Sequence, residues 1–121
     1  MPGRSILIVD DSFIIAERLR NMLEGSENIG AISHAASYSS ALRLLVGAWP
    51  DIVLLDINLP DGSGIDLLQH IKTSQTSTIA IMVSNQSGDY YRRVCRKMGA
   101  DHFFDKSKEF EQIPSIIASL G

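Results

Sequence analysis

Several features that would narrow the class of protein are missing from this sequence. It has a single cysteine, Cys95, which excludes an internal disulfide and fits a reduced, cytoplasmic setting. No apolar run approaches the roughly 20 residues that cross a bilayer, and the run before Asp10 is too short for the core of a signal peptide. The net charge of −3 gives no broad attraction to nucleic acid. We therefore expect a protein that binds neither membranes nor nucleic acid directly.

The 121 residues, 45% of them hydrophobic, suit one compact domain, which we expect to span residues 1–121. Three short apolar runs are rich in β-branched residues and do not alternate with polar ones. Continuous runs of this kind are typical of strands that are covered on both faces, as in a parallel sheet. Two weaker runs complete the set. The predicted strands are residues 5–9, 31–36, 51–55, 79–83 and 101–104.

Amphipathic patterns lie between these runs and after the last one. In the first, Ile15, Leu19 and Leu23 fall on one stripe of a helix, and Ser12 is a candidate N-cap. In the last, Pro114 is expected in the first helical turn, so this helix is predicted to begin late. The predicted helices lie within residues 10–24, 37–48, 63–74, 88–100 and 109–120.

Strands that alternate with helices in a short chain predict an α/β fold, a doubly wound parallel sheet with right-handed crossovers. All strands of such a sheet end at one edge, where ligands bind. Asp10 and Asp11 follow the first predicted strand, Asp56 the third and Ser84 the fourth, and Lys106 lies just past the fifth. We therefore expect these five residues to meet on one rim.

Three clustered carboxylates repel one another unless a cation lies near them. Lys106 supplies one positive charge, and oxygen ligands with retained water suit Mg²⁺ as the second cation. A carboxylate beside a metal ion, an ammonium and a hydroxyl can receive a phosphoryl group, because that transfer depends mainly on positioning and charge neutralisation. The pattern predicts that Asp56 forms an aspartyl phosphate. Taken alone, Asp56 would be a strand-end residue that caps a turn.

Four segments together resemble the receiver domain of two-component response regulators: ILIVDDS, DIVLLDINLPDGSGIDLL, IAIMVSN and GADHFFDKS. The resemblance spans nearly the whole chain. It implies a flavodoxin-like (βα)5 three-layer sandwich with five parallel strands in the order 2-1-3-4-5. It also implies a phosphorylation-dependent signalling switch. A histidine kinase or a histidine phosphotransfer protein would phosphorylate it, and the surface of its fourth helix, fifth strand and fifth helix would then control a partner or an output domain.

The resemblance implies a metal site on the rim, with Mg²⁺ as the expected ion and Mn²⁺ as a possible substitute. Asp56 matches the phosphoryl acceptor and also a metal ligand. Asp11 matches the acid that binds the metal directly, and Asp10 its neighbour, which acts through water. The backbone carbonyl of Asn58 matches a further ligand.

The resemblance also implies a switch. Ser84 matches the hydroxyl that turns towards the phosphoryl group, and Lys106 the lysine that pairs with it. Phe103 matches an aromatic residue that swings between outward and inward positions, although simple core packing is an equal alternative at this spacing. Two residues depart from the pattern of the family. Asn85 stands where a small residue is usual, so we expect it to crowd the phosphoryl site or to hydrogen-bond there. Ser107 replaces the commoner proline, which leaves open whether the preceding peptide bond is cis.

Two surfaces are candidates for partner binding. Phe13 and Ile14 lie off the core stripe of the first helix and close to the acids, so they are expected either to dock helices of the phosphodonor or to be partly buried at the helix start. The fourth helix has a basic outer face, which is either solvated or open to an acidic partner or a second copy. Its basic residues are Arg92, Arg93, Arg96 and Lys97.

Two other functions compete with the switch. A small phosphatase of the haloacid dehalogenase type also forms an aspartyl phosphate, but it needs a second acid two residues after the nucleophile, where this chain has Asn58. A receiver-like adaptor that never takes a phosphoryl group is the other alternative, and the complete set of acids, hydroxyl and lysine argues against it. The switch is not an enzyme towards other molecules, although it would catalyse its own phosphorylation and dephosphorylation.

Overall fold

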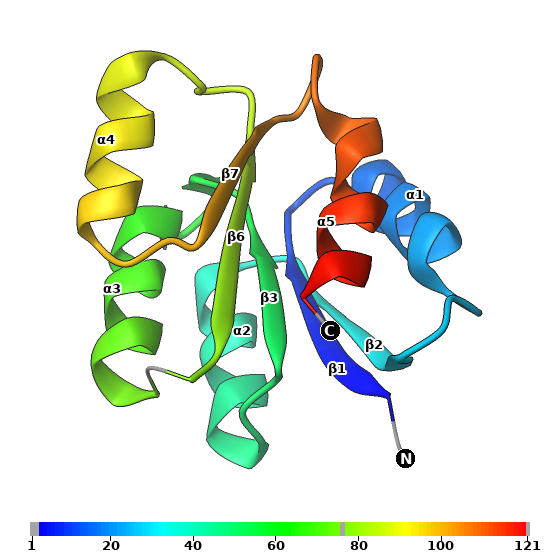
Figure 1. Cartoon of the computed structure of the whole chain (residues 1–121). Helices are drawn as coiled ribbons and strands as arrows, with labels where there is room; N and C mark the ends of the chain where they lie inside the picture. Colours follow the sequence, from blue (N-terminus) through cyan, green and yellow to red (C-terminus); the bar gives the residue numbers. More distant parts are fainter. Residues whose placement is uncertain (1–2, 76, 121) are drawn as a thin grey trace.

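A five-stranded parallel sheet runs through the middle of the molecule (Figure 1). The structure is a computed structural model, and it describes residues 3–75 and 77–120. The strands of this sheet follow the spatial order β2-β1-β3-β6-β7, which is the order 2-1-3-4-5 when they are counted along the chain. The strands are β1 (Arg4–Val9), β2 (Ile29–Ala35), β3 (Ile52–Leu55), β6 (Ile79–Ser84) and β7 (His102–Asp105). The predicted fold class and strand order are confirmed.

Helices cover both faces of the sheet. Figure 1 shows α2, α3 and α4 on one side and α1 and α5 on the other. The helices are α1 (Phe13–Leu23), α2 (Tyr38–Gly47), α3 (Gly64–Ser74), α4 (Asp89–Lys97) and α5 (Ile113–Ser119). None of the helices within the described ranges is long and apolar enough to cross a membrane.

Each face of the sheet has its own hydrophobic core, because the strands contribute side chains alternately to the two sides. On the side of α1 and α5, Ile8 and Leu54 pack with Leu19. On the other side, Val53 and Leu55 pack with residues of α2, α3 and α4. This double coverage explains why the strands read as continuous apolar runs in the sequence.

Two parts of the chain differ from a plain alternation of strands and helices. A short antiparallel hairpin, β4 (Asn58–Leu59) with β5 (Gly62–Ser63), lies between β3 and α3 and was not predicted as strand. The last helix begins late, as Pro114 predicted, because a 3-10 turn at Phe110–Gln112 precedes α5. The hairpin begins two residues after Asp56.

Candidate functional site

Three acids converge where β1 and β3 end. Carboxylate oxygens of Asp10, Asp11 and Asp56 all lie within 4.8 Å of one another. Asp10 and Asp56 are buried, whereas Asp11 is exposed. The two strands pair in parallel, with Val9 opposite Leu55, so the residues that follow them are carried to the same edge. The convergence expected from strand-end positions is therefore found.

Lys106 joins two of these acids. Its Nζ lies 2.7 Å from Oδ2 of Asp10 and 3.1 Å from Oδ2 of Asp56. The backbone amide of Lys106 donates a hydrogen bond to the carbonyl of Ser84 at 3.0 Å, which ties the segment after β7 to the end of β6. One ammonium therefore compensates two buried carboxylates, and the segment that carries it is held against the neighbouring strand.

Burial and neighbouring charges shift the pKa values of two groups in the cluster. Burial raises the pKa of Asp56, and the negative charge of Asp10 adds to this, while Lys106 opposes it. Burial alone would lower the pKa of Lys106, but its hydrogen bonds and charge attraction to Asp10 and Asp56 outweigh that effect and raise it. Lys106 therefore stays protonated at neutral pH, and an added cation would favour the charged form of Asp56.

The donor set fits a hard divalent cation. Three carboxyl groups converge and Lys106 pairs with two of them, so ionisation of all three would leave two negative charges that this ammonium does not compensate. All the converging ligand atoms are oxygens, as Mg²⁺ prefers. The exposure of Asp11 leaves room for the retained water that this ion keeps. Two contacts outside the cluster also hold Asp10 in place. Its Oδ1 accepts a hydrogen bond from the amide of Ser12 at 2.8 Å, and its carbonyl oxygen lies 2.8 Å from Nε2 of His34.

The predicted switch residues lie at the ends of β6 and β7. Ser84 is buried, with 1% of its surface exposed, and its Oγ accepts a hydrogen bond from the amide of Gln86 at 3.1 Å. Phe103 is half-buried beneath Arg92, whose guanidinium carbon lies 4.9 Å from the ring centroid. Ser84 and Phe103 are on neighbouring strands, as the register of Met82 with Phe103 shows.

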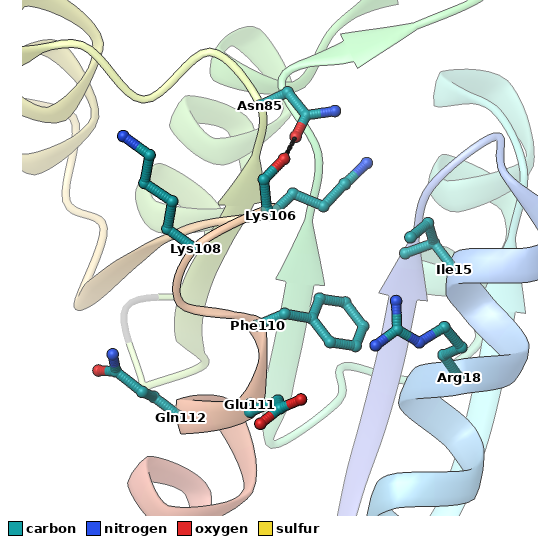
Figure 2. A pocket seen from close by; sticks show the side chains of 9 residues that line it. Ile15, Arg18, Asn85, Lys106, Lys108, Phe110, Glu111 and Gln112 are labelled. Carbon is teal, nitrogen blue, oxygen red and sulfur yellow. Dashed lines mark hydrogen bonds between the residues drawn. The ribbon is translucent and has the colours of Figure 1, made fainter.

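The two departures from the family pattern meet in one contact. Asn85 is exposed, and its Oδ1 accepts a hydrogen bond from Oγ of Ser107 at 3.0 Å (Figure 2). No cis peptide bond occurs in the part of the chain that the structure describes, so the bond between Lys106 and Ser107 is trans. Asn85 thus joins the segments that carry Ser84 and Lys106.

The hairpin after Asp56 fixes the backbone at Asn58. Asn58 is exposed and pairs with Ser63 across the hairpin. Asp61, in its turn, accepts hydrogen bonds from the amides of Tyr38 and Ser39 at 2.7 and 3.1 Å and so caps the N-terminus of α2. The hydrogen bond from Ser39 has the larger effect and that from Tyr38 the smaller, and together they lower the pKa of Asp61. The sequence pattern did not predict this cap, because Asp61 is 22 residues or more from its partners.

The surface beside the acids is both apolar and basic. Phe13 and Ile14 are 68% and 73% exposed, so the alternative that they are partly buried is wrong. A cavity of about 660 Å³, which Ile15 helps to line, lies between α1 and the segment after β7. Figure 2 shows Arg18 of α1 reaching across it towards Phe110, with 4.5 Å from the guanidinium carbon to the ring centroid. Lys106 also lines this cavity, which therefore opens beside the acid cluster.

The basic face of α4 is only partly a solvated surface. Arg93, Arg96 and Lys97 are exposed, but Arg92 is half-buried. Arg92 forms a 2.7 Å ion pair with Glu109, and nothing in the local sequence pattern indicated this partner, which is 17 residues away.

Comparison with known proteins identifies a family that matches this geometry. The model of the response regulator receiver domain matches residues 6–118. The transcriptional activator EvgA of Escherichia coli (strain K12) is 30% identical over 114 residues, which are 94% of this chain and 54% of EvgA. The phosphate regulon regulatory protein PhoB of the same strain is 37% identical over 106 residues, which are 86% of this chain and 45% of PhoB. The chain thus spans about half the length of these relatives.

Solved structures agree on the fold. The signal receiver domain of a DNA-binding response regulator from Colwellia psychrerythraea 34H superposes with a TM-score of 0.89 at 27% identity, and the match covers 98% of each chain. The BeF3-activated DrrB receiver domain superposes with a TM-score of 0.87, covering 97% of this chain and 96% of DrrB. At 23% identity, the likeness to DrrB concerns the fold alone.

Proposed function

The chain belongs to the receiver domain family of response regulators, and from that premise we propose that it is a phosphorylation-dependent signalling switch with Asp56 as the phosphoryl acceptor. The observation that carries this proposal is the meeting of Asp10, Asp11 and Asp56 within 4.8 Å, with Lys106 bonded to two of them. A signalling receiver needs an acceptor carboxylate, a counter-charge beside it and a nearby hydroxyl, and Asp56, Lys106 and Ser84 are the proposed groups. The proposed domain spans residues 1–121.

Each residue on the rim has a distinct proposed task. Asp10, Asp11 and Asp56 hold Mg²⁺, or Mn²⁺ in its place, together with the backbone carbonyl of Asn58. The metal ion supplies charge neutralisation when it is bound. Lys106, which is protonated at neutral pH, pairs with the oxygens of the incoming phosphoryl group.

The proposed transfer is an in-line displacement. An oxygen of Asp56 forms a bond to phosphorus while the P–N bond of a phosphohistidine breaks, and the electron pair returns to the imidazole of the donor. Ser84 then turns its hydroxyl towards the new phosphoryl oxygens, and Phe103 follows. Hydrolysis by water later restores the carboxylate and releases inorganic phosphate. The domain thus catalyses changes on itself and is not proposed to turn over free substrates.

The proposed phosphodonor is a histidine kinase or a histidine phosphotransfer protein. Phe13 and Ile14 are exposed beside the acids, and the neighbouring cavity has apolar and basic walls, so a helix with an apolar face fits there. The proposed output is a change of the surface formed by α4, β7 and α5, which a target protein or an attached domain would read. Direct binding of nucleic acid or membranes is not proposed for this domain.

The function is tested by mass measurement of the intact protein after incubation with acetyl phosphate and Mg²⁺. We expect one added phosphoryl group in the wild-type protein and none in Asp56→Asn. Asp61→Asn is the matched control, since Asp61 is an exposed acid five residues further on, and it should still be modified. Lack of modification of the wild type would favour a receiver-like adaptor, and turnover of a free phosphate ester would favour a phosphatase.

A further inference from the structure

The side chain of Arg92 connects three segments of the α4–β7 surface. Its Nε donates a hydrogen bond to the carbonyl of Ser87 at 2.9 Å, in the loop before α4. Its Nη2 lies 2.7 Å from Oε1 of Glu109, in the segment after β7. Its guanidinium carbon lies 4.9 Å from the ring centroid of Phe103, and its Nη1 lies 3.5 Å from the carbonyl of the same residue. One side chain therefore restrains a loop, a strand and a turn at the same time.

The turn that Arg92 reaches is itself held by two carboxylates. Oε1 of Glu109 also accepts a hydrogen bond from the amide of Asp105 at 2.8 Å. Oδ1 of Asp105 accepts hydrogen bonds from the amides of Ser107 and Lys108 at 2.8 and 2.9 Å. Oδ2 of Asp105 accepts a hydrogen bond from the hydroxyl group of Ser87, in the loop before α4. Asp105 therefore holds the turn in place, and Glu109 connects that turn to α4.

This network includes the chain neighbours of Lys106 and Ser84. Lys106 is inside the turn, and Ser84 begins the loop that Arg92 and Asp105 hold at its other end. The Oγ of Ser84 is bonded to the amide of Gln86 in this loop. If Ser84 moves towards a phosphoryl group on Asp56, the loop that Arg92 contacts would therefore have to move with it.

We propose that Arg92 and Glu109 form a latch that holds Phe103 and the loop 85–87 in the arrangement seen here, and that this latch restrains phosphorylation of Asp56. The inference rests on the proposed function and adds a regulatory element to it. When Ser84 moves towards the phosphoryl group and Phe103 follows, contacts of Arg92 with the loop and with the ring must break. A contact that exists in only one of two arrangements biases the equilibrium towards that arrangement. The ion pair is formed at neutral pH, since the hydrogen bond from Arg92 is the main cause that lowers the pKa of Glu109.

The test measures the initial rate of phosphorylation by acetyl phosphate with Mg²⁺ in Arg92→Gln and Glu109→Gln. Each variant should be phosphorylated about two- to fivefold faster than the wild type, as expected for the loss of one partly exposed ion pair. The double variant should be no faster than the faster single variant, because all three lose the same interaction. Glu109→Gln keeps a side-chain oxygen that can accept the hydrogen bond from the Asp105 amide, so this variant removes the charge and leaves the turn in place.

Two controls separate the latch from a change of net charge. Arg93→Gln and Glu111→Gln alter the same charges on neighbouring exposed residues and should leave the rate unchanged. Acetyl phosphate is an anion, so simple electrostatic steering would slow Arg92→Gln and speed Glu109→Gln. The latch instead predicts that both rates rise.

A second measurement separates the latch from a purely structural role. Amide hydrogen exchange without any phosphodonor should accelerate in residues 85–87 and 101–109 of both variants, while β3 stays as protected as in the wild type. Equal rates of phosphorylation in the wild type and both variants, or rates that change in opposite directions, would overturn the latch and leave the proposed function intact. If Arg92→Gln does not fold, Glu109→Gln decides by the same measurements. A wild type that takes no phosphoryl group would overturn the proposed function, and the regulatory role of the latch with it.

Discussion

Gly64 and Asp56 approach each other so closely that only glycine fits at position 64. A Cβ atom on Gly64 would lie 1.8 Å from the carbonyl oxygen of Asp56. The amide of Gly64 also donates a 2.6 Å hydrogen bond to the carbonyl of Ile57. The first residue of α3 therefore rests directly on the backbone that carries the candidate phosphoryl acceptor.

Replacement of Gly64 by alanine should displace that backbone. We expect Gly64→Ala to lower the free energy of unfolding by about 3 kcal/mol. The added methyl group would overlap backbone atoms, which cannot avoid the clash by a change of side-chain rotamer. Modification of Asp56 by acetyl phosphate should also slow. Urea unfolding followed by circular dichroism measures the first effect and intact mass the second.

The matched control for this substitution is Gly47→Ala. Gly47 ends α2, and no atom lies within 4 Å of a Cβ built there. Alanine should therefore be neutral or slightly stabilising at this position. If Gly64→Ala were as stable as Gly47→Ala, the close approach of α3 to Asp56 would be wrong.

The position of the acids could be predicted from the sequence because the sheet is parallel. Each strand of such a sheet delivers the residue after it to the same edge, so Asp10, Asp11 and Asp56 needed only correct strand ends to be placed together. Ser84 and Lys106 follow the same logic at β6 and β7. The second strand begins at Ile29, two residues before its predicted start. Such an error does not move the rim, because the rim depends on where the strands end.

The contacts that hold the rim in place could not be predicted in this way. Arg92 reads as one of several basic residues on a helix, and its ion pair with Glu109 depends on how α4 packs against the turn after β7. Asp61 caps a helix that begins 23 residues earlier in the chain, whereas capping patterns are recognised over three or four residues. Hydrogen bonds between distant segments leave no periodic signal, so only the assembled fold reveals them.

Lys106 should stabilise the fold as well as the phosphoryl group. We expect Lys106→Gln to lower the free energy of unfolding at neutral pH by about 2 kcal/mol, since removal of one partner leaves buried carboxylates uncompensated. The pKa of Asp56 is already raised in the folded protein, mainly by burial, and it rises further without the lysine. A carboxyl group whose pKa is higher in the folded than in the unfolded protein lowers the free energy of unfolding as the pH rises through its folded pKa. Below its unfolded pKa it has no such effect. The loss should therefore shrink as the pH falls towards 3.8, the ordinary value for an aspartate.

Denaturant unfolding of Lys106→Gln and wild type across this pH range measures that difference. Lys108→Gln is the control, because Lys108 is an exposed lysine two residues further on and its hydrogen bond to Asp105 comes from the backbone amide. A loss of stability that is independent of pH would show that Lys106 acts through packing and not through its charge on Asp56.

The single tryptophan should not report on metal binding at the candidate site. Trp49 precedes β3 and Asp56 follows it, so the two are separated by about 20 Å of extended chain. The indole lies 6.4 Å from the ring of His70 and packs against the core on the side of α2 and α3. Saturating Mg²⁺ should therefore leave the emission of the wild type unchanged, whereas Asn58→Trp in a Trp49→Phe background should respond, because its indole then lies beside the acids. A strong quench of Trp49 itself would mean that Mg²⁺ binds at the other end of the sheet, away from the carboxylates.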